Sequence, residues 1–195
     1  AAFPVVAVKT GMLYSREVIE LVVATLSALP KRPRLVVDPV MVATSGATLL
    51  APEAVESVKK RLIPQAALVT PNLDEAAALL GRPLQSVDDL RWAARGIHGR
   101  WGIPVLVKGG HLRDVPQATD VLWDGQEERV FRAPFVPGVS THGTGCTYSA
   151  AIAAYLALGH SLHVSVEQAK RVITQAIRRS TRLGPDGRHE ALLPG

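Results

Sequence analysis

Residues 66–81, Ala-Ala-Leu-Val-Thr-Pro-Asn-Leu-Asp-Glu-Ala-Ala-Ala-Leu-Leu-Gly, contain the signals of a strand followed directly by a helix. The opening apolar run has strand length and suits a strand buried on both faces of a parallel sheet. Pro71 ends this run, and an Ala/Leu-rich helix follows as far as Gly81. Asn72 and Glu75 have the spacing of an N-cap and its partner, so a capping box explains both without any ligand. The stretch predicts a β-α unit.

Similar apolar runs occur on both sides of this unit, at residues 5–9, 34–38 and 104–108. Segments with helical spacing of apolar residues are predicted to begin near residues 15, 52 and 87. Strands that alternate with helices indicate the α/β class with a mainly parallel sheet.

Two later segments complete this expectation. Residues 120–133 alternate apolar and other residues on either side of Asp124-Gly125, which predicts a hairpin and an antiparallel edge on the parallel sheet. Residues 165–181 have apolar residues on one face and are predicted to form the last helix, whose arginine side is solvated. We therefore expect one domain over residues 1–195.

The composition limits the classes of protein that fit. The chain has 195 residues, 47% apolar and 20% charged, which is typical of one globular domain. Its one cysteine excludes an internal disulfide framework and suggests a reducing compartment, so a cytoplasmic location is expected. No apolar run approaches the roughly 20 residues of a membrane span. The net charge of +5 fits a polyanionic small substrate, whereas the 5% aromatic content gives no indication of nucleic-acid binding.

Residues 140–159, Ser-Thr-His-Gly-Thr-Gly-Cys-Thr-Tyr-Ser-Ala-Ala-Ile-Ala-Ala-Tyr-Leu-Ala-Leu-Gly, are the strongest candidate for a chemical centre. Gly143 and Gly145 allow close approach of a ligand, and the following helix start offers free backbone N–H groups to an anion. Cys146 lies in the first turn, where a thiolate is favoured, and is a candidate base or nucleophile. A tight turn with a threonine cap and a small buried cysteine is the structural alternative.

Four polar residues fall at or just after the ends of predicted strands: Asp38, Asn72, Glu75 and Lys108. The carboxyl ends of parallel strands meet at one edge of an open α/β sheet, where ligands bind. A turn at Asp38-Pro39, the capping box and a solvated lysine remain alternatives that need no ligand.

Five segments, read in order, carry a resemblance to a known family. They are Lys-Thr-Gly-Met-Leu at 9–13, Val-Asp-Pro-Val-Met at 37–41, Thr-Pro-Asn-Leu-Asp-Glu-Ala at 70–76, Val-Lys-Gly-Gly-His at 107–111 and His-Gly-Thr-Gly-Cys-Thr at 142–147. Together they closely resemble the hydroxymethylpyrimidine/phosphomethylpyrimidine kinases of thiamine biosynthesis, in the ribokinase-like superfamily. The resemblance covers nearly the whole chain. A single Gly-Thr-Gly would not be enough to identify the family.

The resemblance implies a three-layer ribokinase-like fold and two ATP-dependent phosphorylations. The first acts on 4-amino-5-hydroxymethyl-2-methylpyrimidine and the second on its monophosphate. Gly143, Thr144, Gly145 and Cys146 would form the anion hole, with Cys146 as the base where related sugar kinases carry aspartate. A thiolate base is physically reasonable at a helix start.

The resemblance also implies the remaining contacts. Asp38, Asn72, Glu75 and Lys108 would bind the nucleotide, and Asp38 and Glu75 would organise Mg²⁺, partly through water. Residues that would contact the substrate are Gly11, Met12, Val107 and His142. Residues 134–139 and the last helix would border the adenine.

Family members ordinarily open with a further β-α portion and a Gly-rich segment, which this sequence lacks. We therefore expect a truncated chain with weakened activity and an exposed sheet edge. A homodimer is an expectation from the family only. A pyridoxal kinase is the nearest alternative, and a non-catalytic nucleotide or vitamer binder is another. A Rossmann dehydrogenase is disfavoured, because no Gly-x-Gly-x-x-Gly follows the first strand.

Overall fold

The computed structural model describes residues 4–41, 49–112, 115–136, 143–183 and 189–192. The first half contains β1 (Ala7–Thr10), α1 (Arg16–Ser27), β2 (Arg34–Val37), α2 (Pro52–Ser57), the π-helical turn η1 (Val58–Leu62), the 3₁₀ turn η2 (Ile63–Gln65), β3 (Leu68–Val69) and α3 (Leu73–Leu80). The second half contains α4 (Val87–Trp101), β4 (Val105–Gly109), β5 (Gln117–Trp123), β6 (Glu128–Pro134), α5 (Thr144–Ala157), α6 (Leu162–Arg178), β7 (Thr181–Leu183) and β8 (His189–Ala191).

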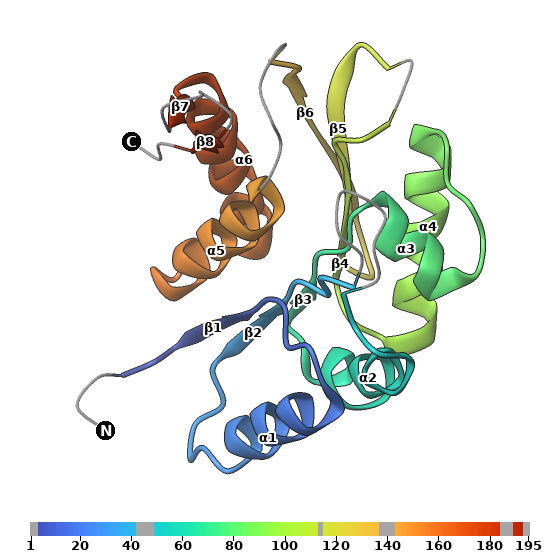
Figure 1. Cartoon of the computed structure of the whole chain (residues 1–195), viewed down its shortest axis with the longest axis vertical. Helices are drawn as coiled ribbons and strands as arrows, with labels where there is room; N and C mark the ends of the chain where they lie inside the picture. The colour runs from blue at the N-terminus through green and yellow to red at the C-terminus, as the bar shows by residue number, and fades with distance from the viewer. Residues whose placement is uncertain (1–3, 42–48, 113–114, 137–142, 184–188, 193–195) are drawn as a thin grey trace.

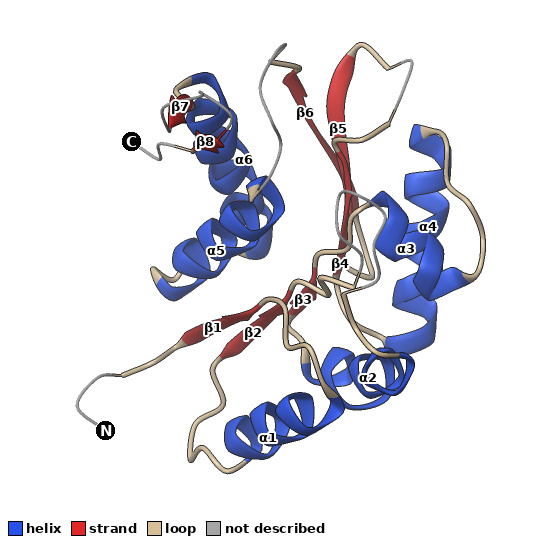
Figure 2. Cartoon of the chain, in the orientation of Figure 1, coloured by secondary structure: helices blue, strands red, loops and turns tan. Residues whose placement is uncertain are grey.

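The main sheet has six strands in the order β1-β2-β3-β4-β5-β6. The strands β1 to β4 run parallel, and β5 and β6 form an antiparallel hairpin that continues the sheet from β4. Helices α1 to α4 cover one face, and α5 and α6 cover the other (Figure 1; Figure 2). This arrangement confirms the predicted three-layer α/β fold with an antiparallel hairpin.

Both faces of the parallel sheet are buried, which explains the continuous apolar runs in the sequence. Val36 on β2 packs in the core beneath α5 and α6, whereas its neighbours Leu35 and Val37 pack in the core on the other face. Successive side chains of a strand point to opposite faces, so a strand covered on both sides must be apolar throughout.

The predicted capping box at the start of α3 is present. The Asn72 side chain accepts a hydrogen bond from the Glu75 backbone N–H, and the Glu75 carboxylate accepts one from the Asn72 backbone N–H. Gly81 ends the helix with a φ of 73°. These contacts satisfy backbone groups at the helix ends, which is why this short helix begins and ends where the sequence predicts.

The predicted start of the last helix was wrong. Helix α6 begins at Leu162 rather than Ser165, because the Ser161 side chain caps it by accepting a hydrogen bond from the Val164 N–H. Ser165 is fully buried within the first turn, and its hydroxyl donates to the Ser161 carbonyl. The structural cap therefore lies four residues before the predicted start.

The strand β1 lies at one edge of the main sheet, and Val5 and Val6 just before it are exposed. None of the described helices has the length and apolar character needed to cross a membrane.

Candidate active site

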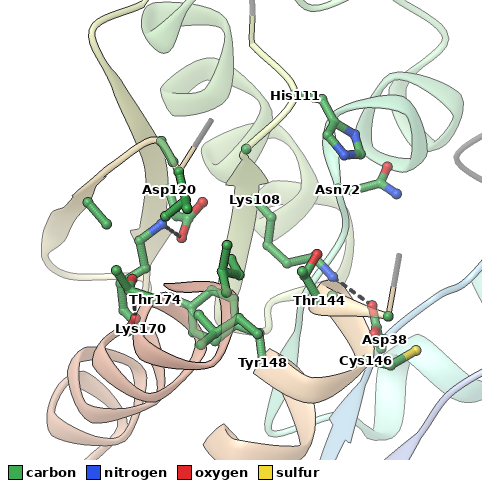
Figure 3. Close-up of a pocket in the computed structure, with 18 of the residues that line it drawn as sticks. Asp38, Asn72, Lys108, His111, Asp120, Thr144, Cys146, Tyr148, Lys170 and Thr174 are labelled. Carbon is green, nitrogen blue, oxygen red and sulfur yellow. Dashed lines mark hydrogen bonds and ion pairs between the residues drawn. The ribbon is translucent and has the colours of Figure 1, made fainter. Parts of the chain in front are cut away.

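A cavity of about 380 Å³ lies between the ends of the central strands and the helices α5 and α6. Asp38 follows β2, Asn72 and Glu75 begin α3, Lys108 lies on β4, and residues 143–146 begin α5, and all of them line this cavity. Figure 3 shows Lys108 in the middle, with Asp38 and Cys146 to one side and Asp120 and Lys170 to the other. The predicted edge of the sheet therefore does bring the candidate residues together.

Asp38 and Lys108 form a buried ion pair at one end of the cavity. The Lys108 Nζ donates to the Asp38 Oδ1 at 2.9 Å, and Ser149 on α5 donates to Oδ2 at 2.9 Å. Asp38 is only 2% exposed. The ion pair links the end of β2 to β4. The Ser149 hydroxyl then links Asp38 to α5, the helix that begins at Thr144.

The start of α5 approaches this pair closely. A Cβ built on Gly145 would lie 3.1 Å from the Lys108 Nζ, so a larger residue here would require the ammonium to shift by a few tenths of an ångström. Gly143 caps the helix with a φ of 79°, in the left-handed region that favours glycine. The start of α5, with the positive end of its helix dipole, therefore faces a lysine across the cavity wall, as an anion site requires.

Cys146 lies in the first turn of α5, is exposed, and lines the cavity. Its backbone carbonyl accepts a hydrogen bond from Ser149 at 3.0 Å, and the same serine hydroxyl contacts Asp38. The thiol is therefore accessible to a ligand and not a small buried core residue. This location agrees with a role in proton transfer, which stays a proposal.

The charges around Lys108 affect one another. Burial lowers the pKa of Lys108, but the carboxylates of Asp38 and Glu75 outweigh it, so the pKa stays above its ordinary value. Burial raises the pKa of Glu75, and the charge of Lys108 and the N–H groups of Asn72 and Met41 only partly oppose this rise. Lys108 is therefore a permanent cation at neutral pH, available to a phosphate.

The carboxylates that would organise Mg²⁺ already accept hydrogen bonds. Asp38 accepts hydrogen bonds at both carboxylate oxygens, and Glu75 accepts from Met41 N at one oxygen and from Asn72 N at the other. Among the described residues, no group of three or more His, Cys, Asp or Glu side chains could hold a metal ion by itself. These two carboxylates therefore fit a hydrated Mg²⁺ that enters with the phosphates of a nucleotide, rather than a metal site made by the protein alone.

The other end of the cavity holds an ion pair that sequence reasoning missed. Lys170 on α6 donates to Asp120 on β5 at 2.6 Å, and the Gly109 N–H donates to the other carboxylate oxygen of Asp120. Tyr148 lies beside them, 4% exposed, and its hydroxyl has no hydrogen-bond partner among the described residues. The sequence did contain an indication that Lys170 is buried, because its helical spacing to the apolar Ile173 places both residues on one face of the helix.

Three other predicted contacts do not line this cavity. Gly11 and Met12 follow β1 outside it, and the Met12 side chain is 56% exposed. Val107 is fully buried in the core between the sheet and the helices α1 to α4, so its side chain is not available to a substrate. His142 lies outside the described residues.

The chain is similar to a known enzyme family along nearly its whole length. The family model described as phosphomethylpyrimidine kinase matches residues 1–190. The hydroxymethylpyrimidine/phosphomethylpyrimidine kinase of Streptomyces coelicolor is 48% identical over 91% of this chain and 65% of the relative. The thiamine biosynthesis bifunctional protein ThiED of Geobacter sulfurreducens is 46% identical over 93% of this chain and 36% of that protein. The chain thus spans less than two thirds of these two relatives.

Solved structures with the same fold include two vitamin kinases. The ADP complex of the Bacillus subtilis pyridoxal kinase aligns with a TM-score of 0.85 and 35% identity, over 99% of this chain and 70% of that chain. The phosphomethylpyrimidine kinase of Clostridium difficile aligns with a TM-score of 0.77 and 40% identity, over 90% of this chain and 70% of that chain.

Proposed function

Because this chain belongs to the phosphomethylpyrimidine kinase family, we propose that it transfers a phosphoryl group from ATP to 4-amino-5-hydroxymethyl-2-methylpyrimidine and then to the resulting monophosphate. The observation that carries the proposal is the start of α5 facing the Asp38–Lys108 pair. Phosphoryl transfer needs mainly alignment and stabilisation of negative charge, which helix amides and a lysine supply.

The proposed reaction uses Cys146 and the first turn of α5. In the first transfer the substrate hydroxyl attacks the terminal phosphorus of ATP, the bond to the bridging oxygen of ADP breaks, and Cys146 accepts the hydroxyl proton. In the second transfer an oxygen of the substrate phosphate is the nucleophile, and the same bond to ADP breaks. Gly143, Thr144 and Gly145 present backbone N–H groups to the phosphoryl oxygens, and Lys108 adds a positive charge. Accessibility of the Cys146 thiol at the cavity supports this assignment.

We assign the nucleotide end to Asp38, Asn72, Glu75 and Lys108, which line the same cavity. Mg²⁺ would enter with the nucleotide and reach the carboxylates of Asp38 and Glu75 only through water. When bound, it would supply positive charge to the phosphates. Gly11, Met12 and His142 remain proposed substrate contacts. Val107 would contribute only indirectly, by holding β4, the strand that carries Lys108, in the core.

A pyridoxal kinase is the second candidate. The observation in its favour is structural, because the pyridoxal kinase of Staphylococcus aureus, solved with ADP, aligns with a TM-score of 0.87. Its 34% identity is lower than the 48% identity to the Streptomyces pyrimidine kinase, so we place the pyrimidine first.

An exposed catalytic thiol works best in a reducing compartment, which supports a cytoplasmic location. A homodimer is proposed from the family alone.

The proposal is tested by ADP release from Mg-ATP with the pyrimidine alcohol, its monophosphate or pyridoxal offered separately. Turnover of both pyrimidines is the expected result, and Cys146→Ala should abolish it while nucleotide still binds. Turnover of pyridoxal alone would replace the pyrimidine assignment. Binding of ATP without turnover of any acceptor would make this chain a non-catalytic binder.

A further inference from the structure

The turn after β2 contains a backbone conformation that its residue disfavours. Val40 has a φ of 44°, in the left-handed region, although it carries a β-branched side chain. It lies two residues after Asp38 and lines the same cavity. Strained backbone of this kind persists only where surrounding contacts hold it, and it occurs often at functional sites.

The contacts that hold the turn come from Glu75. One carboxylate oxygen accepts the Met41 N–H at 3.2 Å, and the other accepts the Asn72 N–H at 2.8 Å. Met41 and Glu75 are each only 2% exposed, so water does not compete for these bonds. The Met41 carbonyl accepts a further hydrogen bond from Leu49 N at 2.9 Å. A single buried carboxylate therefore joins the strained turn to the first turn of α3.

We propose that Glu75 is a positioning residue whose carboxylate holds the strained turn at Val40 and thereby fixes Asp38 at the reactive end of the cavity. The carboxylate of Asp38 must lie within reach of both Lys108 and Ser149, each at 2.9 Å. If the turn relaxed, Asp38 would shift with it, and the lysine would lose its fixed place opposite Gly145.

This role differs from that of a metal-binding residue in a measurable way. The kinetic part rests on the proposed kinase function. Gln at position 75 can still accept one N–H, but its amide nitrogen opposes the second donor and leaves it unpaired. We expect Glu75→Gln to lower kcat by about tenfold or more, since a buried charged acceptor is lost. The Mg²⁺ concentration at half-maximal rate should change much less than kcat, because Mg²⁺ would meet Glu75 only through water. A shift of that midpoint as large as the loss of kcat would overturn the proposal in favour of a metal-binding role.

The strain at Val40 provides a rescue experiment. Glycine adopts a positive φ without steric cost, so a turn with Val40→Gly needs less support from Glu75. We expect Glu75→Gln to lower kcat less in a Val40→Gly background than in the parent chain. Equal losses in both backgrounds would show that the two positions are not coupled. Glu53→Gln, which removes an exposed carboxylate in the first turn of α2, serves as the matched control.

A readout without turnover separates failure of this proposal from failure of the kinase assignment. The exchange rate of the Met41 backbone amide, followed by NMR, should rise about tenfold or more in Glu75→Ala, which removes both acceptor oxygens. The control variant should leave it unchanged. Unchanged exchange in Glu75→Ala would overturn the clamp even if the chain is an active kinase. Faster exchange in a chain without turnover would support the clamp and refute only the kinase assignment.

Discussion

At the residue scale, Gly145 is the position where one added methyl group tests the proposed anion hole. Gly145→Ala would place its Cβ 3.1 Å from the Lys108 Nζ, so the ammonium must shift by a few tenths of an ångström, and the methyl group would lie where the phosphoryl oxygens are proposed to bind. We expect kcat to fall about tenfold, equivalent to a loss of about 1.4 kcal/mol of transition-state stabilisation, with a smaller change in nucleotide affinity. Gly145→Asp should lower turnover further, because it adds a negative charge. Equal losses of turnover and nucleotide affinity would contradict the anion-hole role.

The matched control for this substitution is Gly99→Ala. Gly99 lies within α4, and a Cβ built on it meets nothing within 4 Å. Replacing a helical glycine by alanine there should stabilise the fold by about 0.5–1 kcal/mol without affecting turnover. A loss of turnover in the control would show that the assay responds to general changes in the helices.

Tyr148 gives a residue-scale prediction about stability and pH. Its buried hydroxyl lies near the Asp120 carboxylate but outside the geometry of a hydrogen bond, so Tyr148→Phe should stabilise the fold by about 1 kcal/mol at pH 7. Burial and then the Asp120 carboxylate raise the pKa of Tyr148 well above 10. The unfolded chain ionises near pH 10, so the wild type loses stability as pH rises above that value, and Tyr148→Phe does not share this loss.

Urea unfolding at pH 7 and at pH 10.5 checks this difference. The advantage of Tyr148→Phe over the wild type should be larger at the higher pH. A variant less stable than the wild type at pH 7 would show that the hydroxyl has a partner in solution.

At the scale of an element, the start of α4 depends on a capping box. The Ser86 side chain accepts the Asp89 N–H at 3.1 Å, and the Asp89 carboxylate accepts the Ser86 N–H at 3.1 Å. Ser86→Ala should lower the free energy of unfolding by about 1 kcal/mol, measured by urea denaturation. Ser27→Ala removes a hydroxyl whose bond to Gln65 is exposed and should change it by less than about 0.5 kcal/mol. Similar losses in both variants would argue against a special contribution from the cap.

At the scale of the whole molecule, the Asp120–Lys170 pair joins the antiparallel hairpin to the layer formed by α5 and α6. Both side chains are largely buried, so Lys170→Met leaves Asp120 without its counter-charge. We expect the free energy of unfolding to fall by about 3–5 kcal/mol, and the loss to be much smaller when Asp120→Asn is added. Arg171→Met, which breaks an exposed pair with Glu167, should cost less than about 1 kcal/mol. If the double variant lost as much free energy of unfolding as the two single variants together, Asp120 and Lys170 would not be coupled.

The sequence by itself determined the class of fold, because local patterns are enough for it. Continuous apolar runs mark strands covered on both faces, and the Asn72–Glu75 spacing predicts the cap that α3 has. The C-terminal ends of parallel strands share one edge, so Asp38 and Lys108 could be predicted to meet there.

Only the tertiary structure decided what these side chains contact. The Glu75 bond to Met41 and the Lys170 bond to Asp120 join positions 34 and 50 residues apart in the chain. The helical spacing of Lys170 to Ile173 places the lysine near the apolar face of α6, but no local pattern identifies Asp120 as its partner. Burial then determines the chemistry, since a carboxylate removed from water must take its hydrogen bonds from whatever the fold brings beside it.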